Sequence, residues 1–183
     1  MLARAADSVL VIIDIQERLA AAMVPAQRQA AVRNTRILIQ AAACLGIPVL
    51  ATEQYRKGLG PTVTELTEVL PGGTQRLEKT CFSCAGAEPF STALGASGRS
   101  QVILAGMEAH VCVLQSALEL RAAGREVFVV EDACCSRKQE NRTNAMYRLR
   151  GAGVVVTNTE SVLFEWLRDA RHEHFKAIST LLR

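Results

Sequence analysis

The sequence predicts an α/β fold, a three-layer α/β/α sandwich in which helices cover both faces of one parallel sheet. Six short apolar segments alternate with helical segments and no linker interrupts them, which is the pattern of successive βαβ units. Aromatic residues make up only 4% of the chain, so Ala, Val, Leu and Ile must fill the core between helices and sheet. At about 150 residues per domain, residues 1–183 are expected to form a single domain.

The first strand is expected at 8–13, where the run SVLVII is apolar, mostly β-branched, and stops at Asp14. A long helix is expected over 25–46, because Gly46 suits a C-terminal cap. Pro48 then prevents the helix from continuing.

The second strand is expected at 48–52, from the run PVLAT. A polar loop at 53–60 and a short helix at 61–70 follow it. The third strand is expected near 75–78, although apolar residues are few in that segment. These elements complete the first half of the sheet.

The second half repeats the same alternation of helix and strand. Helices are expected at 89–96 and 112–124, and strands at 101–106 and 126–132, where the runs QVILAG and EVFVVED are strongly apolar. The chain then continues with further elements at 139–150 (helix), 154–157 (strand), 161–167 (helix) and 172–182 (helix).

Charge and composition exclude several classes of protein. The 21 Lys and Arg residues exceed the 18 Asp and Glu residues by three, which is too few and too evenly scattered for a nucleic-acid or membrane-surface partner. No apolar run approaches the roughly 20 residues of a membrane span, and no secretory signal is recognised. We therefore expect a cytoplasmic protein with reduced cysteines and no membrane partner.

Three residues are candidates for chemistry, because ligands bind at the carboxyl ends of parallel strands. Asp14 ends the first strand, Lys79 ends the third, and Cys112 follows the strand 101–106 at the start of a helix. Each also has a structural interpretation: a turn-capping aspartate, a solvated lysine, and a small core thiol. Together they form a nucleophile with a base and an electrostatic partner.

The charge of this group leads to an expectation about the pKa of Cys112. A helix N-terminus and Lys79 should lower that pKa, whereas Asp14 should raise it. We expect the lowering influences to prevail, so that Cys112 is the most reactive of the six thiols at neutral pH.

Three motifs carry a resemblance to a known family. The segments VIIDIQERL at 11–19, EKTCFS at 78–83 and AGMEAHVCVLQSALEL at 105–120 resemble the isochorismatase-like, or cysteine hydrolase, superfamily. The segment VVEDACCSR at 129–137 and the C-terminal tail are most similar to its isochorismatase domain-containing branch. The resemblance implies a six-stranded parallel sheet with Rossmann-like order 3-2-1-4-5-6.

The resemblance also implies roles for particular residues. It makes Asp14, Lys79 and Cys112 a catalytic triad, and it implies a cis peptide between Met107 and Glu108 that aims backbone N–H groups at an oxyanion. An acidic residue at Glu108 departs from many relatives and places their familiar substrates in doubt. The resemblance further implies that Gln16, Phe82 and Ser83 line the ligand pocket. For Gln16, a structural role is equally open.

The departures from the family narrow the expected function. Nicotinamidases bind a metal through an aspartate and two histidines after the second strand, whereas this chain reads TEQYRKGLG there, so we expect no metal and no cofactor. The leading hypothesis is a cofactor-independent hydrolase that cleaves a C–N bond of a small amide or carbamoyl substrate. In this hypothesis Cys112 attacks the carbonyl and forms a thioester, which water then cleaves.

Two other classes of function remain open on the sequence. One is a catalytically silent binding or scaffold protein on the same fold, and the other is a thiol redox protein that uses Cys81 and Cys84. The family also implies a homo-oligomer, for which the apolar C-terminal helices offer either an interface or buried contacts within the subunit.

Overall fold

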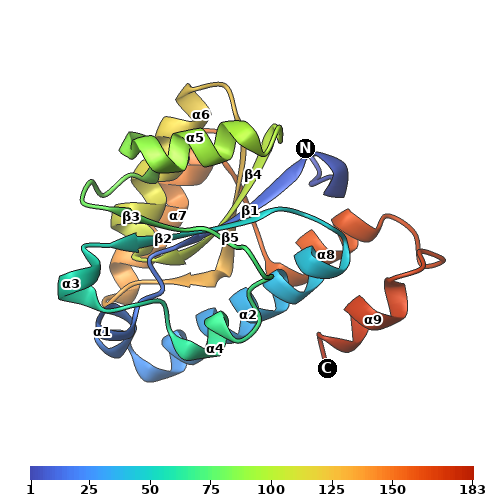
Figure 1. Cartoon of the computed structure of the whole chain (residues 1–183), viewed down its shortest axis with the longest axis horizontal. Helices are drawn as coiled ribbons and strands as arrows, with labels where there is room; N and C mark the ends of the chain where they lie inside the picture. The colour runs from blue at the N-terminus through green and yellow to red at the C-terminus, as the bar shows by residue number, and fades with distance from the viewer.

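The computed structural model describes residues 1–183 and contains one six-stranded parallel sheet (Figure 1). The strand order is β3-β2-β1-β4-β5-β6, which confirms the expected order. The strands are β1 (Ser8–Ile13), β2 (Val49–Gln54), β3 (Arg76–Lys79), β4 (Gln101–Met107), β5 (Glu126–Cys135) and β6 (Val155–Thr157). The chain reverses its direction of travel across the sheet between β1 and β4, which is where such folds bind ligands.

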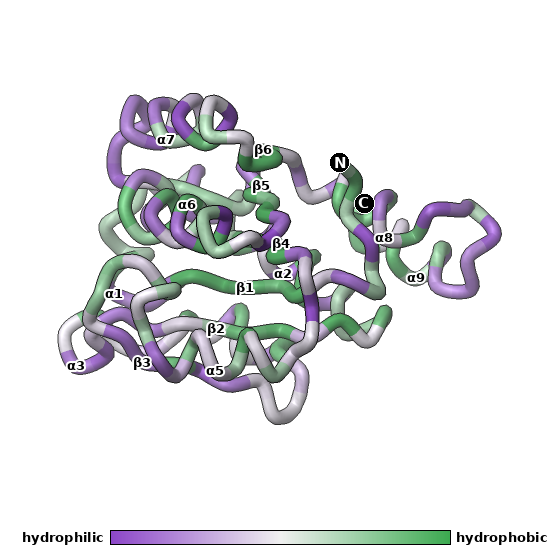
Figure 2. The backbone as a smooth tube through the Cα atoms, turned by 90° about the horizontal axis from the view of Figure 1, so that it is seen from above, coloured by the Kyte–Doolittle hydropathy of each residue, from purple (hydrophilic) through white to green (hydrophobic).

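Helices cover both faces of the sheet, as Figures 1 and 2 show. One layer contains α5, α6 and α7, and the other contains α2, α4, α8 and α9. The α-helices are α1 (Glu17–Ala21), α2 (Pro25–Cys44), α3 (Arg56–Leu59), α4 (Thr64–Thr67), α5 (Glu88–Ala96), α6 (Leu114–Ala122), α7 (Gln139–Gly151), α8 (Thr159–Leu167) and α9 (Phe175–Thr180). Three short elements complete the chain: the 3-10 turns Ala5–Asp7 and Cys84–Gly86, and a π-helical turn at Ala109–Val113.

The central strand β1 shows why the sheet needs two helical layers. All six of its residues are buried, and alternate side chains enter opposite cores, as in any strand covered on both faces. Leu10 and Ile12 join the core beneath α2 and α8, whereas Val11 and Ile13 join the core beneath α5 and α6. In Figure 2 the tube of β1 is accordingly apolar along its length.

Strands β1 and β4 approach each other very closely at Gly106. This residue has φ +151°, and a Cβ atom placed on it would lie 2.2 Å from the carbonyl oxygen of Ile13. Only glycine fits there without displacing the backbone. The approach brings the end of β1 next to the end of β4, and thereby brings Asp14 near the turn that follows β4.

The structure corrects several expected boundaries. Strand β2 continues to Gln54, α3 lies within the segment expected to be a loop, and α1 has no counterpart among the expected elements. Strand β5 continues beyond the expected end at 132 to Cys135, so it includes Cys134 and Cys135. In the sequence, the polar residues at 131–132 indicate the end of the strand. In the structure, the register between β5 and β4 shifts near Gly106, and the two strands pair again beyond that shift.

The C-terminal helices are held mainly within the subunit. Trp166 and Leu163 of α8 and Ile178 of α9 are buried in the core beneath α2, and the Trp166 indole N–H donates to Ser8 Oγ at 3.0 Å. Phe164 remains partly exposed and lies against Phe175, with 6.2 Å between ring centroids. None of the helices combines the length and apolar character that crossing a membrane requires.

Candidate active site

Asp14 lies directly after β1 and is completely buried. Its backbone has φ +52°, in the left-handed region that aspartate enters more readily than most residues. Its two carboxylate oxygens have different partners: Oδ1 accepts a hydrogen bond of 2.7 Å from Thr52 Oγ1, and Oδ2 accepts one of 2.7 Å from Lys79 Nζ. The carboxylate is therefore fixed in orientation at the carboxyl edge of the sheet.

Lys79 is the last residue of β3, and its side chain reaches Asp14 at the end of β1, although β2 lies between the two strands. The side chain is only 1% exposed, so it is a buried cation, and the structural interpretation of a solvated lysine is wrong. Besides Asp14, its ammonium group donates to Gln54 Oε1 at 2.8 Å and to the carbonyl oxygens of Phe82 and Cys81 at 3.0 and 3.2 Å. These acceptors compensate the cost of burying the charge.

Cys112 lies in the π-helical turn that joins β4 to α6, and it is buried. The thiol lies close enough to Asp14 and Lys79 for both charges to influence its pKa. The structure thus brings Asp14, Lys79 and Cys112 together from three separate segments. Irregular turns of this type occur frequently at functional sites.

The expectation of a lowered pKa for Cys112 is wrong. Burial, followed by the negative charge of Asp14, raises the pKa of the Cys112 thiol to about 12, and the opposing influence of Lys79 is smaller. A hydrogen bond from the backbone N–H of Glu108 also favours the thiolate, but it too is outweighed. The resting thiol is therefore protonated at neutral pH, and its activation requires a base.

The expected oxyanion site lies at the peptide between Met107 and Glu108, at the end of β4. The peptide between Met107 and Glu108 is cis. The Glu108 side chain is 8% exposed and forms an ion pair of 2.9 Å with Arg137 Nε. The Arg137 side chain is 59% exposed, but Glu108 accepts hydrogen bonds from one edge of its guanidinium.

The three expected pocket residues have other contacts. Gln16 is buried and bridges two segments, since its amide accepts from Gln54 N and donates to Gly60 O at 2.7 and 2.6 Å. Phe82 has an exposed ring, and its carbonyl accepts from Lys79. Ser83 is buried and accepts a hydrogen bond of 3.2 Å from Ala85 N. All three contribute to the shape of the loops around Lys79.

The Cys81 and Cys84 thiols differ in their surroundings. Cys84 is buried, and desolvation raises its pKa to about 12, although Ser116 forms a hydrogen bond that lowers it. Its backbone N–H donates to Ser116 Oγ at 2.9 Å. Cys81 is half-buried and its sulfur lies toward Gly86. A thiol as strongly protonated as Cys84 is a poor attacking group for redox exchange.

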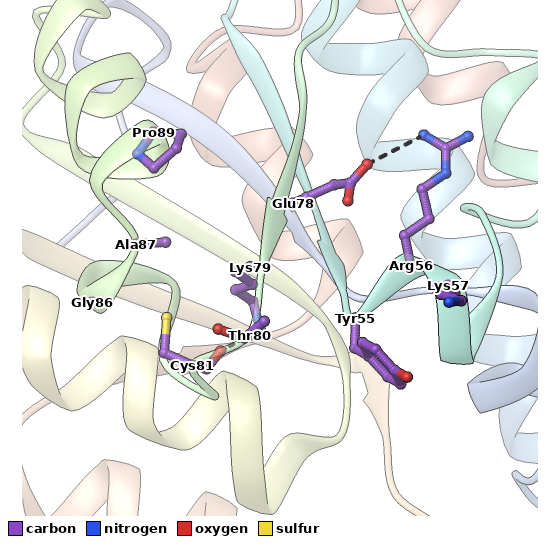
Figure 3. A pocket seen from close by; sticks show the side chains of 10 residues that line it. All are labelled: Tyr55, Arg56, Lys57, Glu78, Lys79, Thr80, Cys81, Gly86, Ala87 and Pro89. Atoms are coloured by element: carbon purple, nitrogen blue, oxygen red, sulfur yellow. Dashed lines mark hydrogen bonds and ion pairs between the residues drawn. The ribbon is translucent and has the colours of Figure 1, made fainter.

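A cavity of about 390 Å³ adjoins the cluster of Asp14, Lys79 and Cys112 on the Lys79 side (Figure 3). It lies between the start of α3 and the start of α5, and its lining consists of Tyr55, Arg56, Lys57, Glu78, Lys79, Thr80, Cys81, Gly86, Ala87 and Pro89. Asp14 and Cys112 do not line it. Its volume falls in the range of small-molecule sites.

Tyr55 lines this cavity, and both its backbone and its ring are constrained. Its backbone has φ +37°, and its N–H donates to Lys79 O at 2.8 Å. Its ring lies so close to Gly58 that a Cβ there would be 2.2 Å from the ring. Arg56, the next residue, pairs with the buried Glu53 at 3.3 Å.

Sequence reasoning missed two residues that orient the triad, Thr52 and Gln54. Both lie at the end of β2, and the register places Thr52 beside Ile13 and Gln54 beside Lys79. The strand order is the only signal that could have found them, because neither residue stands near Asp14 or Lys79 in the sequence. Elsewhere, no three His, Cys, Asp or Glu side chains are grouped so that they could hold a metal ion.

Comparison with known proteins identifies the family. The family model of the isochorismatase domain matches residues 8–161. Isochorismatase domain-containing protein 2 of Danio rerio is 41% identical over 175 residues, which cover 96% of this chain and 86% of the relative.

Solved structures give the same result. The MAR1 ribonuclease of Caenorhabditis elegans is 36% identical, with a TM-score of 0.93 and coverage of 100% of this chain and 92% of that one. The YcaC gene product of Escherichia coli, described as an octameric hydrolase of unknown specificity, is 27% identical with a TM-score of 0.91, covering 100% of this chain and 89% of that one. Together with the motifs and the strand order, these matches show that the chain belongs to the isochorismatase family.

Proposed function

We propose that the protein is a cofactor-independent hydrolase that cleaves a C–N bond of a small amide or carbamoyl compound. The observation that carries this proposal is the meeting of Asp14, Lys79 and Cys112 in one buried cluster at the reversal point of the sheet. A nucleophile, a base and a fixed positive charge are the groups that covalent acyl transfer needs. A family whose members are generally hydrolases supports the same reaction class.

The first step is attack on the substrate carbonyl by Cys112. Because the thiol is protonated at rest, Asp14 accepts its proton as the C–S bond forms. The positive charge of Lys79 stabilises the negative charge in the site before and after that transfer. Backbone N–H groups of Glu108 and Cys112 stabilise the negative charge that develops on the carbonyl oxygen.

The second half returns the enzyme to its starting state. Asp14 gives the proton to the departing nitrogen as the C–N bond breaks, leaving an acyl thioester on Cys112 and releasing ammonia or an amine. A water molecule then attacks the thioester while Asp14 accepts its proton, and the proton returns to the sulfur as the acid leaves. All steps use only side-chain and backbone groups of the chain.

A substrate that enters the cavity beside Lys79, which measures about 390 Å³, would be a small molecule. We also propose a homo-oligomer, in line with the octameric Escherichia coli relative. The buried residues of α8 and α9 are already used within the subunit, so the interface would lie elsewhere on the surface.

Ammonia release from a panel of amides, ureas and carbamoyl compounds tests the proposal. Cys112→Ala and Cys112→Ser should stay folded and lose turnover by at least about a thousandfold, because nucleophilic catalysis is removed. Cys44→Ala is the matched control, since Cys44 lies on α2 away from the site, and it should retain activity. A chelator should not change the rate.

Other outcomes would favour the alternative functions. Full activity in Cys112→Ala would exclude the covalent mechanism. Absence of turnover on the whole panel would favour a binding role. RNA cleavage that depends on Asp14 would instead extend to this chain the activity for which the Caenorhabditis elegans relative is named.

A further inference from the structure

The backbone of Glu108 is the anchor of the turn that carries Cys112. Its carbonyl oxygen accepts hydrogen bonds from Val111 N at 3.1 Å and from Val113 N at 3.2 Å, the two residues that flank Cys112. A displacement of Glu108 would therefore move the segment that carries the Cys112 thiol.

The Glu108 side chain is anchored in turn by one residue, Arg137. The carboxylate accepts three hydrogen bonds, all from Arg137: Nε to Oε1 at 2.9 Å, Nη2 to Oε2 at 3.1 Å, and the backbone N–H to Oε1 at 3.2 Å. The two guanidinium contacts form the planar fork that arginine makes with carboxylates and lysine cannot reproduce. Although burial opposes it, this pairing leaves the pKa of Glu108 below its ordinary value, so the carboxylate is ionised and occupied.

Arg137 stands between the end of β5 and the start of α7, and its neighbours also contact the turn. His110, two residues before Cys112, lies 3.0 Å from Ser136 Oγ through Nδ1 and 3.3 Å from Asn141 Nδ2 through Nε2. The turn is thus attached to the β5–α7 junction at two points, of which the Glu108–Arg137 pair is the charged one.

We infer that Arg137 is a positioning residue for the nucleophile: by fixing Glu108, it fixes the carbonyl oxygen that holds Val111 and Val113 on either side of Cys112. The role of this placement in turnover rests on the proposed function, whereas its effect on the thiol does not. Arg137 has no part in proton transfer, because the base is Asp14 and the Glu108 carboxylate is fully engaged.

The alkylation of Cys112 by iodoacetamide tests this inference without a substrate. The rate is measured by peptide mapping between pH 7 and pH 10, with circular dichroism to verify folding. Below the thiol pKa the rate reports the thiolate fraction. In Arg137→Gln the Glu108 carboxylate loses its fork, and we expect Cys112 to react about tenfold more slowly at every pH, with Arg137→Lys intermediate.

The matched control is Arg150→Gln. Arg150 is a half-exposed arginine on α7 that pairs with Glu131 at 2.9 Å, away from the turn, and its loss should leave the Cys112 rate within twofold of the original. If Arg137→Gln does not fold, Glu108→Gln, which keeps the side-chain shape but weakens the fork, should show the same slowing. A folded Arg137→Gln that reacts as fast as the original protein, or faster, would overturn the inference.

Kinetics on any amide found in the panel give a second readout. Arg137→Gln should lower kcat about tenfold and leave KM within about twofold, with partial rescue in Arg137→Lys, because the nucleophile is displaced while the cavity is unchanged. A change in KM alone would contradict a positioning role. If the original protein turns over no amide, the proposed function fails and the alkylation rates still decide the inference.

Discussion

At the scale of single residues, Asp14 and Lys79 form a buried ion pair at the centre of the candidate site. Both side chains are almost completely buried, so each charge depends on the other and on the surrounding hydrogen-bond partners. The desolvation cost of such a pair is large, and removing one member leaves an uncompensated charge in the interior. The pair is therefore weak evidence for added stability but strong evidence that both members must be present together.

Replacing Lys79 by methionine should lower the free energy of unfolding by about 3–5 kcal/mol, because the buried Asp14 carboxylate loses its cation. Urea denaturation measures the change. The double variant Asp14→Asn/Lys79→Met, which removes both charges, should recover much of the loss. A single variant within about 1 kcal/mol of the original protein would show that the pair is not coupled as the structure indicates.

The meeting of Asp14, Lys79 and Cys112 is predictable from the sequence, because each residue closes or follows a strand and lies in a motif that resembles the family. The direction of the Cys112 pKa shift is not predictable in this way, because burial and then the negative charge of Asp14 outweigh the positive charge of Lys79. The partner of Glu108 is also not predictable from the sequence, since Arg137 is 29 residues away along the chain. Contacts of this kind depend on the strand order and on loop paths.

At the scale of elements, the site exists because β1 and β4 lie unusually close where they end. Gly106→Ala would place a methyl group against the Ile13 carbonyl and impose an unfavourable φ. We expect a loss of unfolding free energy on the order of 2–4 kcal/mol, together with loss of Cys112 reactivity as the strand ends separate.

Gly95→Ala is the control for that substitution. Gly95 lies in α5, and a Cβ added there would have no atom within 4 Å, so alanine should be neutral or stabilising by up to about 1 kcal/mol. Urea denaturation compares the two variants. Equal stability of Gly106→Ala and Gly95→Ala would show that the close approach of the strands is not required.

Elements with strong local sequence patterns are predictable, and the expected boundaries differ from the observed ones where the local pattern is weak. Strands β1 and β4 are continuous apolar runs, and the expected starts of both are confirmed. The expected end of β5 is too early, because its polar residues at 131–132 are tolerated by a register shift against β4 that no local pattern encodes. The π-helical turn is likewise held by tertiary contacts, those of Glu108 with Arg137 and of His110 with Ser136.

At the scale of the whole molecule, four buried thiols make stability depend on alkaline pH. Burial raises the pKa of Cys84, Cys112, Cys134 and Cys135 to about 12. In the unfolded chain these thiols ionise near their ordinary value of about 8.5. Their contribution to stability is therefore complete below that value and is lost as the pH rises toward 12.

The unfolding free energy should accordingly fall between about pH 9 and pH 11, with each such thiol contributing a slope of up to about 1.4 kcal/mol per pH unit. In Cys84→Ala the slope should be smaller by one such contribution. Val113→Ala, a core truncation without a titrating group, should shift the curve downward without changing its slope. Identical slopes in all three proteins, measured by urea denaturation, would contradict the raised pKa of Cys84.

The four acceptors around Lys79 Nζ have one more consequence, for labelling by amine-specific acylating reagents. An ammonium has three N–H groups, and here they are all occupied, so Lys79 offers neither a free hydrogen bond to a ligand nor an accessible amine. The other lysines, Lys57, Lys138 and Lys176, are exposed. In the folded protein, mass spectrometry should find these three lysines acylated and Lys79 unmodified. Loosening the loop at 81–82 should make Lys79 reactive, so its acylation reports whether the carboxyl edge of the sheet is assembled.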